Sequence, residues 1–149
     1  MVSSNTSIVK NLYLDIDGVI LDKRGCPAYG LEGFLRFAIV HFSCFWLTTH
    51  CSGNAKLTLS YLTSKVPKEA LELMSGIRPT AWSLWKTEAI DFTKPFYWLD
   101  DYAFDGERKV LREHRCESSL ILINLETNPK QLEALCKQLK ETFSVATSP

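Results

Sequence analysis

The sequence lacks several features that would place it in a specialised class of protein. No apolar run approaches the ~18 residues of a membrane-spanning helix, and the first seven residues have neither the basic start nor the apolar stretch of a signal peptide. Neither sign of charge is in excess, because 17 basic residues balance 17 acidic ones. We therefore expect a cytoplasmic protein with no membrane partner, whose charge gives no support to nucleic-acid binding.

Disulfide frameworks, zinc sites and domain linkers are also missing. The five cysteines are scattered, odd in number and without a C-x-x-C pair, which predicts reduced thiols that mostly fill the core. No repeat, low-complexity stretch or Pro/Gly/Ser-rich linker divides the chain. Its 149 residues, 46% of them hydrophobic, are predicted to form a single domain over residues 1–149. The oligomeric state is open.

What is present is an alternation of short apolar runs with helix-like stretches. The runs predict strands over 8–16, 43–48, 95–100 and 120–123. The stretches between them predict helices over 31–42, 55–63, 68–75, 86–92, 105–115 and 129–143. For the last helix we expect Asn128 as cap and Pro129 as first residue, and for residues 18–30 a loop or small hairpin. This order predicts an α/β, three-layer Rossmann-like fold with a mostly parallel central sheet.

Four of the seven aspartates fall where two of these strands end. Asp15 and Asp17 follow the first strand, and Asp100 and Asp101 follow the third. Because the carboxyl ends of parallel strands share one edge of a sheet, these carboxylates would converge, which is costly unless a cation lies among them. Carboxylate oxygens favour a hard divalent cation, and Mg²⁺ suits a few carboxylates combined with a substrate phosphate.

The spacing of the first pair adds a chemical argument. Two residues that are two apart at a strand end point to the same side, so either Asp15 or Asp17 could attack a substrate while the other moves a proton. Gly18 follows directly, and glycine allows the backbone to turn tightly next to a ligand.

Four segments, in this order, resemble the motifs of the haloacid dehalogenase (HAD) superfamily. Residues 12–21 (LYLDIDGVIL) resemble its first motif, an apolar strand running into D-x-D-G-V, and residues 45–49 (FWLTT) its second, a strand ending in Thr or Ser. Lys86 matches the third motif, a lone lysine near the start of a helix, and residues 96–101 (FYWLDD) resemble the fourth, a strand ending in an acidic pair. The ordered set over residues 12–101 is specific, whereas residues 102–149 match only as a generic strand and helix.

The resemblance implies a Mg²⁺-dependent phosphomonoester hydrolase that acts through an aspartyl-phosphate. Asp15 would be the nucleophile. Asp17 would be the general acid for the leaving oxygen and then the base for the attacking water. Thr48 would hydrogen-bond a phosphate oxygen, and Lys86 would neutralise developing charge and keep Asp15 ionised.

The resemblance also implies a ligand set for the metal. Mg²⁺ would be held by Asp15, by Asp17 through its backbone carbonyl and by Asp101. Asp100 would be a water-mediated partner, and the order within the Asp100–Asp101 pair stays open because this acidic pair tolerates a shift of one residue.

Several neighbouring residues are alternatives or additions to these sites. Thr49 could take the role of Thr48, Lys94 lies close to Lys86 in the sequence, and Asp105 is a spare acidic candidate. His50 adjoins the second motif and could contact the substrate, although a lone histidine is more often structural.

The gaps between motifs bear on the substrate. Thirty residues separate Asp17 from Thr48 and 37 separate Thr48 from Lys86, so neither gap holds a sizeable cap domain. An uncapped, open site suits a phosphorylated small molecule or macromolecule, or a site that a partner closes. We expect residues 52–83 to determine specificity, with Trp82 and Trp85 as a possible substrate platform. The alternative functions are a phosphate-binding or partner-regulating protein with little turnover, and a nucleotide or nucleic-acid phosphatase.

Overall fold

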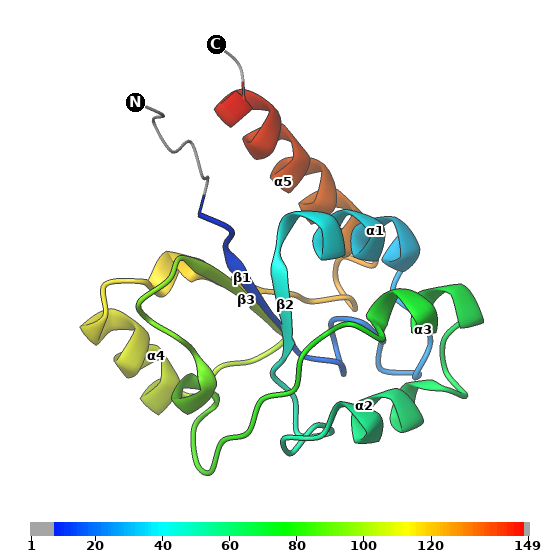
Figure 1. Ribbon diagram of the computed structural model, residues 1–149, viewed down its shortest axis with the longest axis horizontal. Coiled ribbons are helices and arrows are strands. Elements are labelled where there is room, and N and C mark those ends of the chain that lie inside the picture. Colours follow the sequence, from blue (N-terminus) through cyan, green and yellow to red (C-terminus); the bar gives the residue numbers. More distant parts are fainter. Residues whose placement is uncertain (1–7, 148–149) are drawn as a thin grey trace, which may run out of the picture.

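The computed structural model describes residues 8–147, which fold around one parallel β-sheet (Figure 1). Its strands are β1 (Asn11–Leu14), β2 (Ser43–Trp46), β3 (Phe96–Asp100) and β4 (Leu120–Leu122). They lie in the order β2-β1-β3-β4, and every neighbouring pair is parallel. The expected α/β fold is confirmed, with a sheet that is parallel across all four of these strands.

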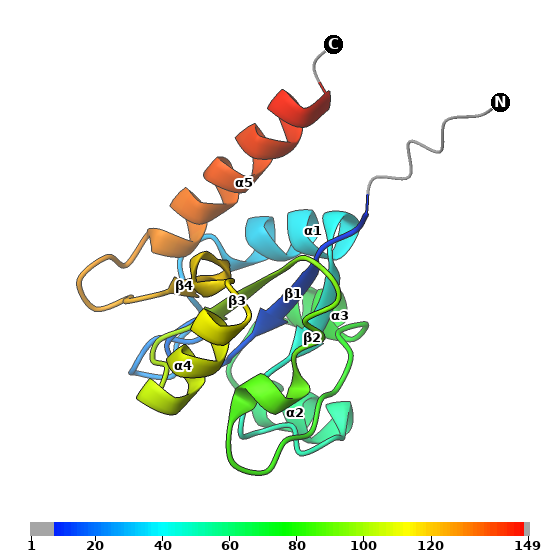
Figure 2. The ribbon, with the colours of Figure 1, turned by 90° about the vertical axis from the view of Figure 1, so that its left-hand side faces the viewer.

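Helices cover both faces of the sheet. They are α1 (Leu31–His41), α2 (Ala55–Leu62), α3 (Lys68–Met74), α4 (Asp105–Glu113) and α5 (Gln131–Thr147), with short 3₁₀ helices η1 (Lys86–Ala89) and η2 (Glu117–Ser119). Helices α1 and α5 pack together on one face, with α3 against α1, while α4 and η1 lie on the other (Figure 2). The three expected layers are therefore present, and between residues 8 and 147 no helix has the length and apolarity to cross a membrane.

Each central strand is buried on both faces, which explains why its sequence is apolar except for Asn11 at the start of β1 and Asp100 at the end of β3. In β1, Leu12 and Leu14 join the apolar cluster formed with α1 and α5, whereas Tyr13 joins the cluster formed with α4. In β3, Leu99 and Trp98 divide between the same two clusters. Successive residues of a strand point to opposite faces, so a strand covered on both sides needs apolar residues at every position.

The first strand is shorter than the expected range 8–16, and this changes the argument from spacing. β1 ends at Leu14 because the carbonyl of Ile16 accepts the backbone N–H groups of Val19, Ile20 and Leu21 and closes a tight turn. Asp17 therefore lies in this turn rather than on an extended strand. The prediction that Asp15 and Asp17 point to the same side, which assumed the alternating side chains of a strand, is therefore wrong in its premise.

Two helices also differ from expectation. Over 86–92 only η1 forms, because Ile90 is extended and packs into the core while the N–H of Asp91 donates to the Tyr13 hydroxyl at 2.9 Å. Helix α5 begins at Gln131 rather than Pro129, since the N–H of Gln131 still closes a turn onto Asn128. The remaining strands and helices agree with expectation to within three residues at each end.

The hairpin and the cysteines agree with the sequence argument. Leu21 and Pro27 form an antiparallel bridge within residues 18–30. Cys44, Cys51 and Cys136 are buried, and all five cysteines are free thiols. Burial raises the pKa of Cys44 to about 12, so this thiol stays protonated and acts as an apolar filler.

Candidate functional site

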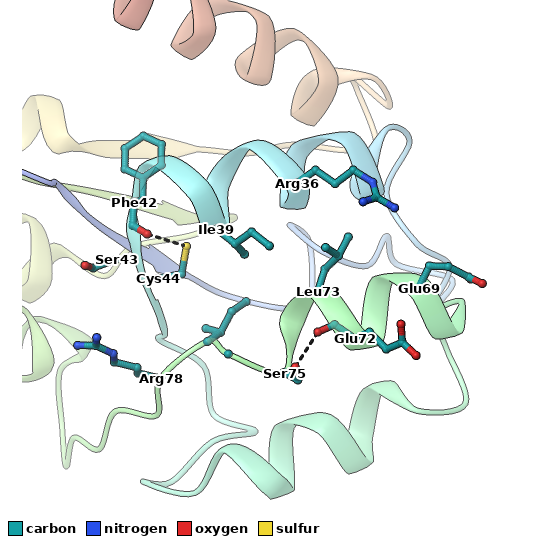
Figure 3. Close-up of a pocket in the computed structure, with 12 residues that line it drawn as sticks. Arg36, Ile39, Phe42, Ser43, Cys44, Glu69, Glu72, Leu73, Ser75 and Arg78 are labelled. Atoms are coloured by element: carbon teal, nitrogen blue, oxygen red, sulfur yellow. Dashed lines mark hydrogen bonds between the residues drawn. The ribbon is translucent and has the colours of Figure 1, made fainter.

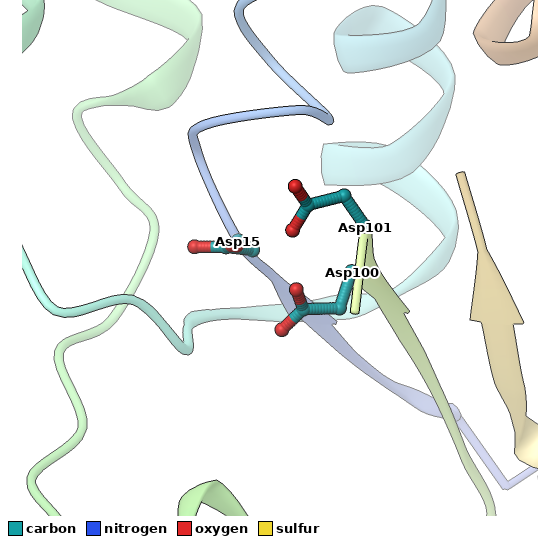
Figure 4. Close-up of side chains that lie close together, drawn as sticks. All are labelled: Asp15, Asp100 and Asp101. Carbon is teal, nitrogen blue, oxygen red and sulfur yellow. The ribbon is translucent and has the colours of Figure 1, made fainter. Parts of the chain in front are cut away.

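Three carboxylates gather where β1 and β3 end. Asp15 follows β1, Asp100 is the last residue of β3 and Asp101 follows it (Figure 4). One oxygen from each lies within 4.8 Å of the other two. The parallel pairing of the strands brings them together, because the N–H of Asp15 continues the ladder by donating to the carbonyl of Leu99 at 3.1 Å. Residues 85 positions apart in the sequence thus become neighbours.

Lys86 supplies a positive charge beside these carboxylates. Its Nζ lies 2.7 Å from Asp100 Oδ2 and 3.5 Å from Asp15 Oδ2. All three side chains are largely buried, and Asp100 has only 2% of its side chain exposed. Lys94, the alternative lysine, is exposed, and it is Lys86 that contacts the two carboxylates.

Burial and mutual repulsion disturb the charges of this cluster. Burial, and then the negative charge of Asp15, raise the pKa of Asp100 from 3.8 to about 6. Burial also raises the pKa of Asp15 and of Asp101. Burial acts to lower the pKa of Lys86, but Asp15 and Asp100 outweigh it and leave that pKa raised, so the ammonium stays charged.

One lysine cannot neutralise three carboxylates, and this imbalance is what a divalent cation would correct. The donor set consists only of carboxylate oxygens, which hard cations prefer. The residues present therefore fit a Mg²⁺ ion, with Asp15, Asp100 and Asp101 as the side chains that would hold it.

The backbone of Lys86 is fixed by a buried acid that sequence reasoning missed. Glu107, in the first turn of α4, accepts the N–H of Lys86 at 2.8 Å and the N–H of Phe104 at 2.9 Å, and it is 2% exposed. Glu88 folds the preceding loop by accepting the N–H groups of residues 83–85. A carboxylate held by backbone donors at a helix start is stable without a counterion. Glu107 thus ties the backbone of Lys86 to the start of α4.

Asp100 is oriented by residues that lie two positions before and after it in the chain. The indole Nε1 of Trp98 donates to Asp100 Oδ2 at 3.1 Å, and the N–H of Tyr102 donates to Oδ1 at 3.2 Å. Trp98 is fully buried. The sequence alone does not distinguish Trp98 from a tryptophan that only fills the core. Its separation of two residues from Asp100 places both side chains on one face only if this segment is a strand.

Gly18 is required by the close approach of Asp101. Gly18 has φ of 87°, and a Cβ on it would lie 2.6 Å from the Cβ of Asp101. Such a contact is far inside van der Waals distance, and a positive φ also disfavours residues with a side chain. The glycine after the D-x-D pair therefore makes room for an acid from the other strand.

Asp17 does not contribute its side chain to the acidic cluster. Its Oδ2 lies 2.8 Å from His50 Nε2, and its Oδ1 accepts the Tyr61 hydroxyl at 2.9 Å. His50 thus contacts a candidate catalytic residue, and Tyr61 is a further residue that the sequence analysis missed. Burial and the adjacent Asp17 raise the pKa of the Tyr61 hydroxyl, so it remains a donor.

Among Thr48, Thr49 and Asp105, only Thr48 is buried, and it contacts His50. Thr48 is 1% exposed and its hydroxyl oxygen accepts the N–H of His50 at 3.3 Å. Thr49 and Asp105 are exposed. Trp85 is half-buried against Gly106 and Phe104, at the start of α4.

Cavities at the two ends of the sheet differ in character. A cleft of about 150 Å³ opens beside the cluster and is lined by Gly18, Lys23, Asp101 and residues 123–126. A larger cavity of about 580 Å³ lies between α1, α3 and the start of β2, at the amino end of the sheet (Figure 3). Ligands of parallel sheets bind at the carboxyl ends of the strands, so the cleft beside the acids is the candidate ligand site.

No family model matches the chain, and neither curated proteins nor solved structures give a significant match. The assignment of function therefore depends on the geometry of the site and on the motifs in the sequence.

Proposed function

We propose that this protein is a Mg²⁺-dependent phosphomonoester hydrolase of the HAD type, with Asp15 as nucleophile. The observation that carries the proposal is the meeting of Asp15, Asp100, Asp101 and Lys86 at the carboxyl edge of the sheet. A nucleophilic carboxylate beside a charged lysine and two further acids suits the transfer of a dianionic phosphoryl group.

The bound cation would shield the charge of the nucleophile from that of the phosphate. Lys86 would hold Asp15 ionised through its contact at 3.5 Å and would attract the equatorial oxygens of the transferring group. Asp15 forms the new bond to phosphorus while the bond to the leaving oxygen breaks. The carboxyl of Asp17 gives its proton to that oxygen, and its carboxylate later takes one from the water that releases phosphate.

The presence of Asp17 favours a hydrolase of phosphate esters over one that cleaves carbon–halogen or phosphonate bonds, because a leaving alkoxide needs an acid. The cleft beside the acids has a volume of about 150 Å³, below the roughly 300–1,000 Å³ of typical ligand pockets, so it would enclose only part of a substrate. The substrate class is therefore left to a screen of phosphorylated metabolites, nucleotides and oligonucleotides.

The test is hydrolysis of 4-nitrophenyl phosphate in Mg²⁺ and in EDTA. We expect Asp15→Asn to lose about three orders of magnitude or more in turnover, as removal of a nucleophile does elsewhere. Asp105→Asn makes the same change at an exposed acid and should retain activity. Fluoroberyllate should bind the wild type with Mg²⁺ and fail to bind Asp15→Asn.

Two results would oppose the proposal. Wild-type turnover equal to that of Asp15→Asn, together with measurable phosphate binding, would favour the phosphate-binding alternative. Turnover that is unaffected by EDTA would remove the role of the cation.

A further inference from the structure

The carboxylate of Asp17 is held by two side chains that none of the motifs includes. His50 Nε2 contacts one oxygen at 2.8 Å and the Tyr61 hydroxyl donates to the other at 2.9 Å. The Asp17 side chain is 57% exposed, and a carboxylate this open is normally free to rotate. Here each oxygen makes one hydrogen bond, which fixes the orientation of the carboxyl group and leaves a second site on each oxygen for the proton that is transferred.

His50 and Tyr61 also support each other. Their rings are stacked with centroids 3.7 Å apart and planes 13° from parallel. The Nζ of Lys65 lies 4.4 Å from the centre of the Tyr61 ring, a distance at which a cation is attracted to an aromatic face. The two groups that contact Asp17 thus form one unit rather than two independent side chains.

This unit is anchored in the fold independently of Asp17. The N–H of His50 donates to the Thr48 hydroxyl at 3.3 Å, and the carbonyl of His50 accepts the hydroxyl of Thr58 at 3.4 Å. Thr48 and Thr58 are both buried, and Tyr61 stands near the end of α2. The position of the stacked pair is therefore fixed by contacts with the end of β2 and with α2 that do not involve Asp17.

We propose that His50 and Tyr61 are positioning residues that hold the Asp17 carboxyl in the orientation for proton transfer to the leaving oxygen. The inference rests on the proposed function, because only there does Asp17 donate a proton as the bond between phosphorus and the leaving oxygen breaks. Fixed geometry is what makes a general acid effective, since a proton is transferred only across a hydrogen bond that is already aligned.

The dependence of rate on the leaving group separates this role from a structural one. An ester whose leaving group is a weak acid needs protonation, whereas a nitrophenolate departs without it. Disturbing a general acid therefore slows the hydrolysis of phenyl phosphate more than the hydrolysis of 4-nitrophenyl phosphate. Disturbing the fold slows both equally.

The variants are Tyr61→Phe and His50→Phe. Each keeps an aromatic ring for the stack and removes the polar atom that contacts Asp17. We expect kcat/KM for phenyl phosphate to fall about tenfold and that for 4-nitrophenyl phosphate to fall less than about threefold, as a partial loss of the 10²–10⁴-fold typical of acid–base catalysis. The ratio kcat/KM is used because it reports the steps up to departure of the leaving group, even where hydrolysis of phosphorylated Asp15 limits kcat.

Two matched substitutions serve as controls. Tyr97→Phe removes a hydroxyl that accepts Lys10 near the amino end of β3. His114→Phe replaces a histidine that is stacked on Phe92 at 3.9 Å, just after α4. Both should leave the ratio of the two substrates unchanged.

Equal losses on the two esters, no loss, or a gain on phenyl phosphate would overturn the inference while leaving the proposed function intact. The proposed function fails separately, if the wild type hydrolyses neither ester or if Asp15→Asn retains its rate, and the inference then falls with it. Urea unfolding of the purified variants confirms that each protein compared is folded.

Discussion

Replacing Gly18 by alanine should disrupt the acidic cluster by displacing Asp101. The new Cβ would lie 2.6 Å from the Cβ and 2.7 Å from the Cγ of Asp101. The Cβ of Asp101 is fixed to its backbone, so rotating the carboxyl group does not relieve the contact. Either the loop after β1 or the residue after β3 must move, and both carry ligands of the candidate Mg²⁺ site.

The expected loss in the free energy of unfolding has two parts, and a substitution at a second glycine separates them. Gly25 also has a positive φ, of 78°, but a Cβ there would meet nothing within 4 Å. Gly25→Ala should therefore lose only the backbone cost, about 1–2 kcal/mol in the free energy of unfolding. Gly18→Ala should lose a further 1–3 kcal/mol or so, the cost of forcing extra atoms into a packed region.

The assay combines urea unfolding with calorimetric titration of Mg²⁺. We expect Gly18→Ala to bind Mg²⁺ at least about tenfold more weakly than the wild type, a loss of about 1.4 kcal/mol or more, and Gly25→Ala to bind it normally. If the two variants lose the same stability and bind Mg²⁺ equally well, then Asp101 is not held against the turn and the geometric argument is wrong.

Three further predictions concern the groups around the cluster. Lys86→Met leaves Asp100 buried without a positive charge beside it and should lower the free energy of unfolding by about 3 kcal/mol or more in EDTA. Lys94→Met changes an exposed lysine and should not lower it. Equal urea midpoints for the two variants would refute this prediction. Glu107→Gln places an amide against two backbone donors and should lower the free energy of unfolding by about 1–3 kcal/mol, with the exposed Glu113→Gln as control. An unchanged urea midpoint would show that Glu107 does not hold the backbone of Lys86 and Phe104. The fold raises the pKa of Asp100 from 3.8 to about 6, so the folded state binds a proton at Asp100 more tightly than the unfolded chain does. The contribution of this protonated carboxyl to stability is therefore lost as the pH rises from about 4 to about 6. In EDTA, the free energy of unfolding of Asp100→Asn relative to the wild type should therefore increase from about pH 4 to about pH 6, and a constant or decreasing difference would contradict the pKa shift.

Local sequence determined the layers of the fold and the edge where the acids collect. The two central strands are mostly apolar because both of their faces are covered, as Leu12, Tyr13 and Leu14 demonstrate. In a parallel sheet, residues that end separate strands meet at one edge whatever the loops between them do. The sequence therefore predicts that Asp15 and Asp100 lie together, and the resemblance to the HAD motifs predicts Lys86 beside them.

The tertiary structure alone decided which side chains touch. The turn at Ile16 leaves the Asp17 side chain outside the cluster of three acids and in contact with Tyr61, 44 residues later. Glu107 reaches Lys86 because α4 packs on η1. Neither contact leaves a periodic signal in the sequence, because the partners belong to elements whose relative placement is fixed by packing and not by local propensity. The sequence thus determined where charge would gather, and the packing of the helices determined how it is held.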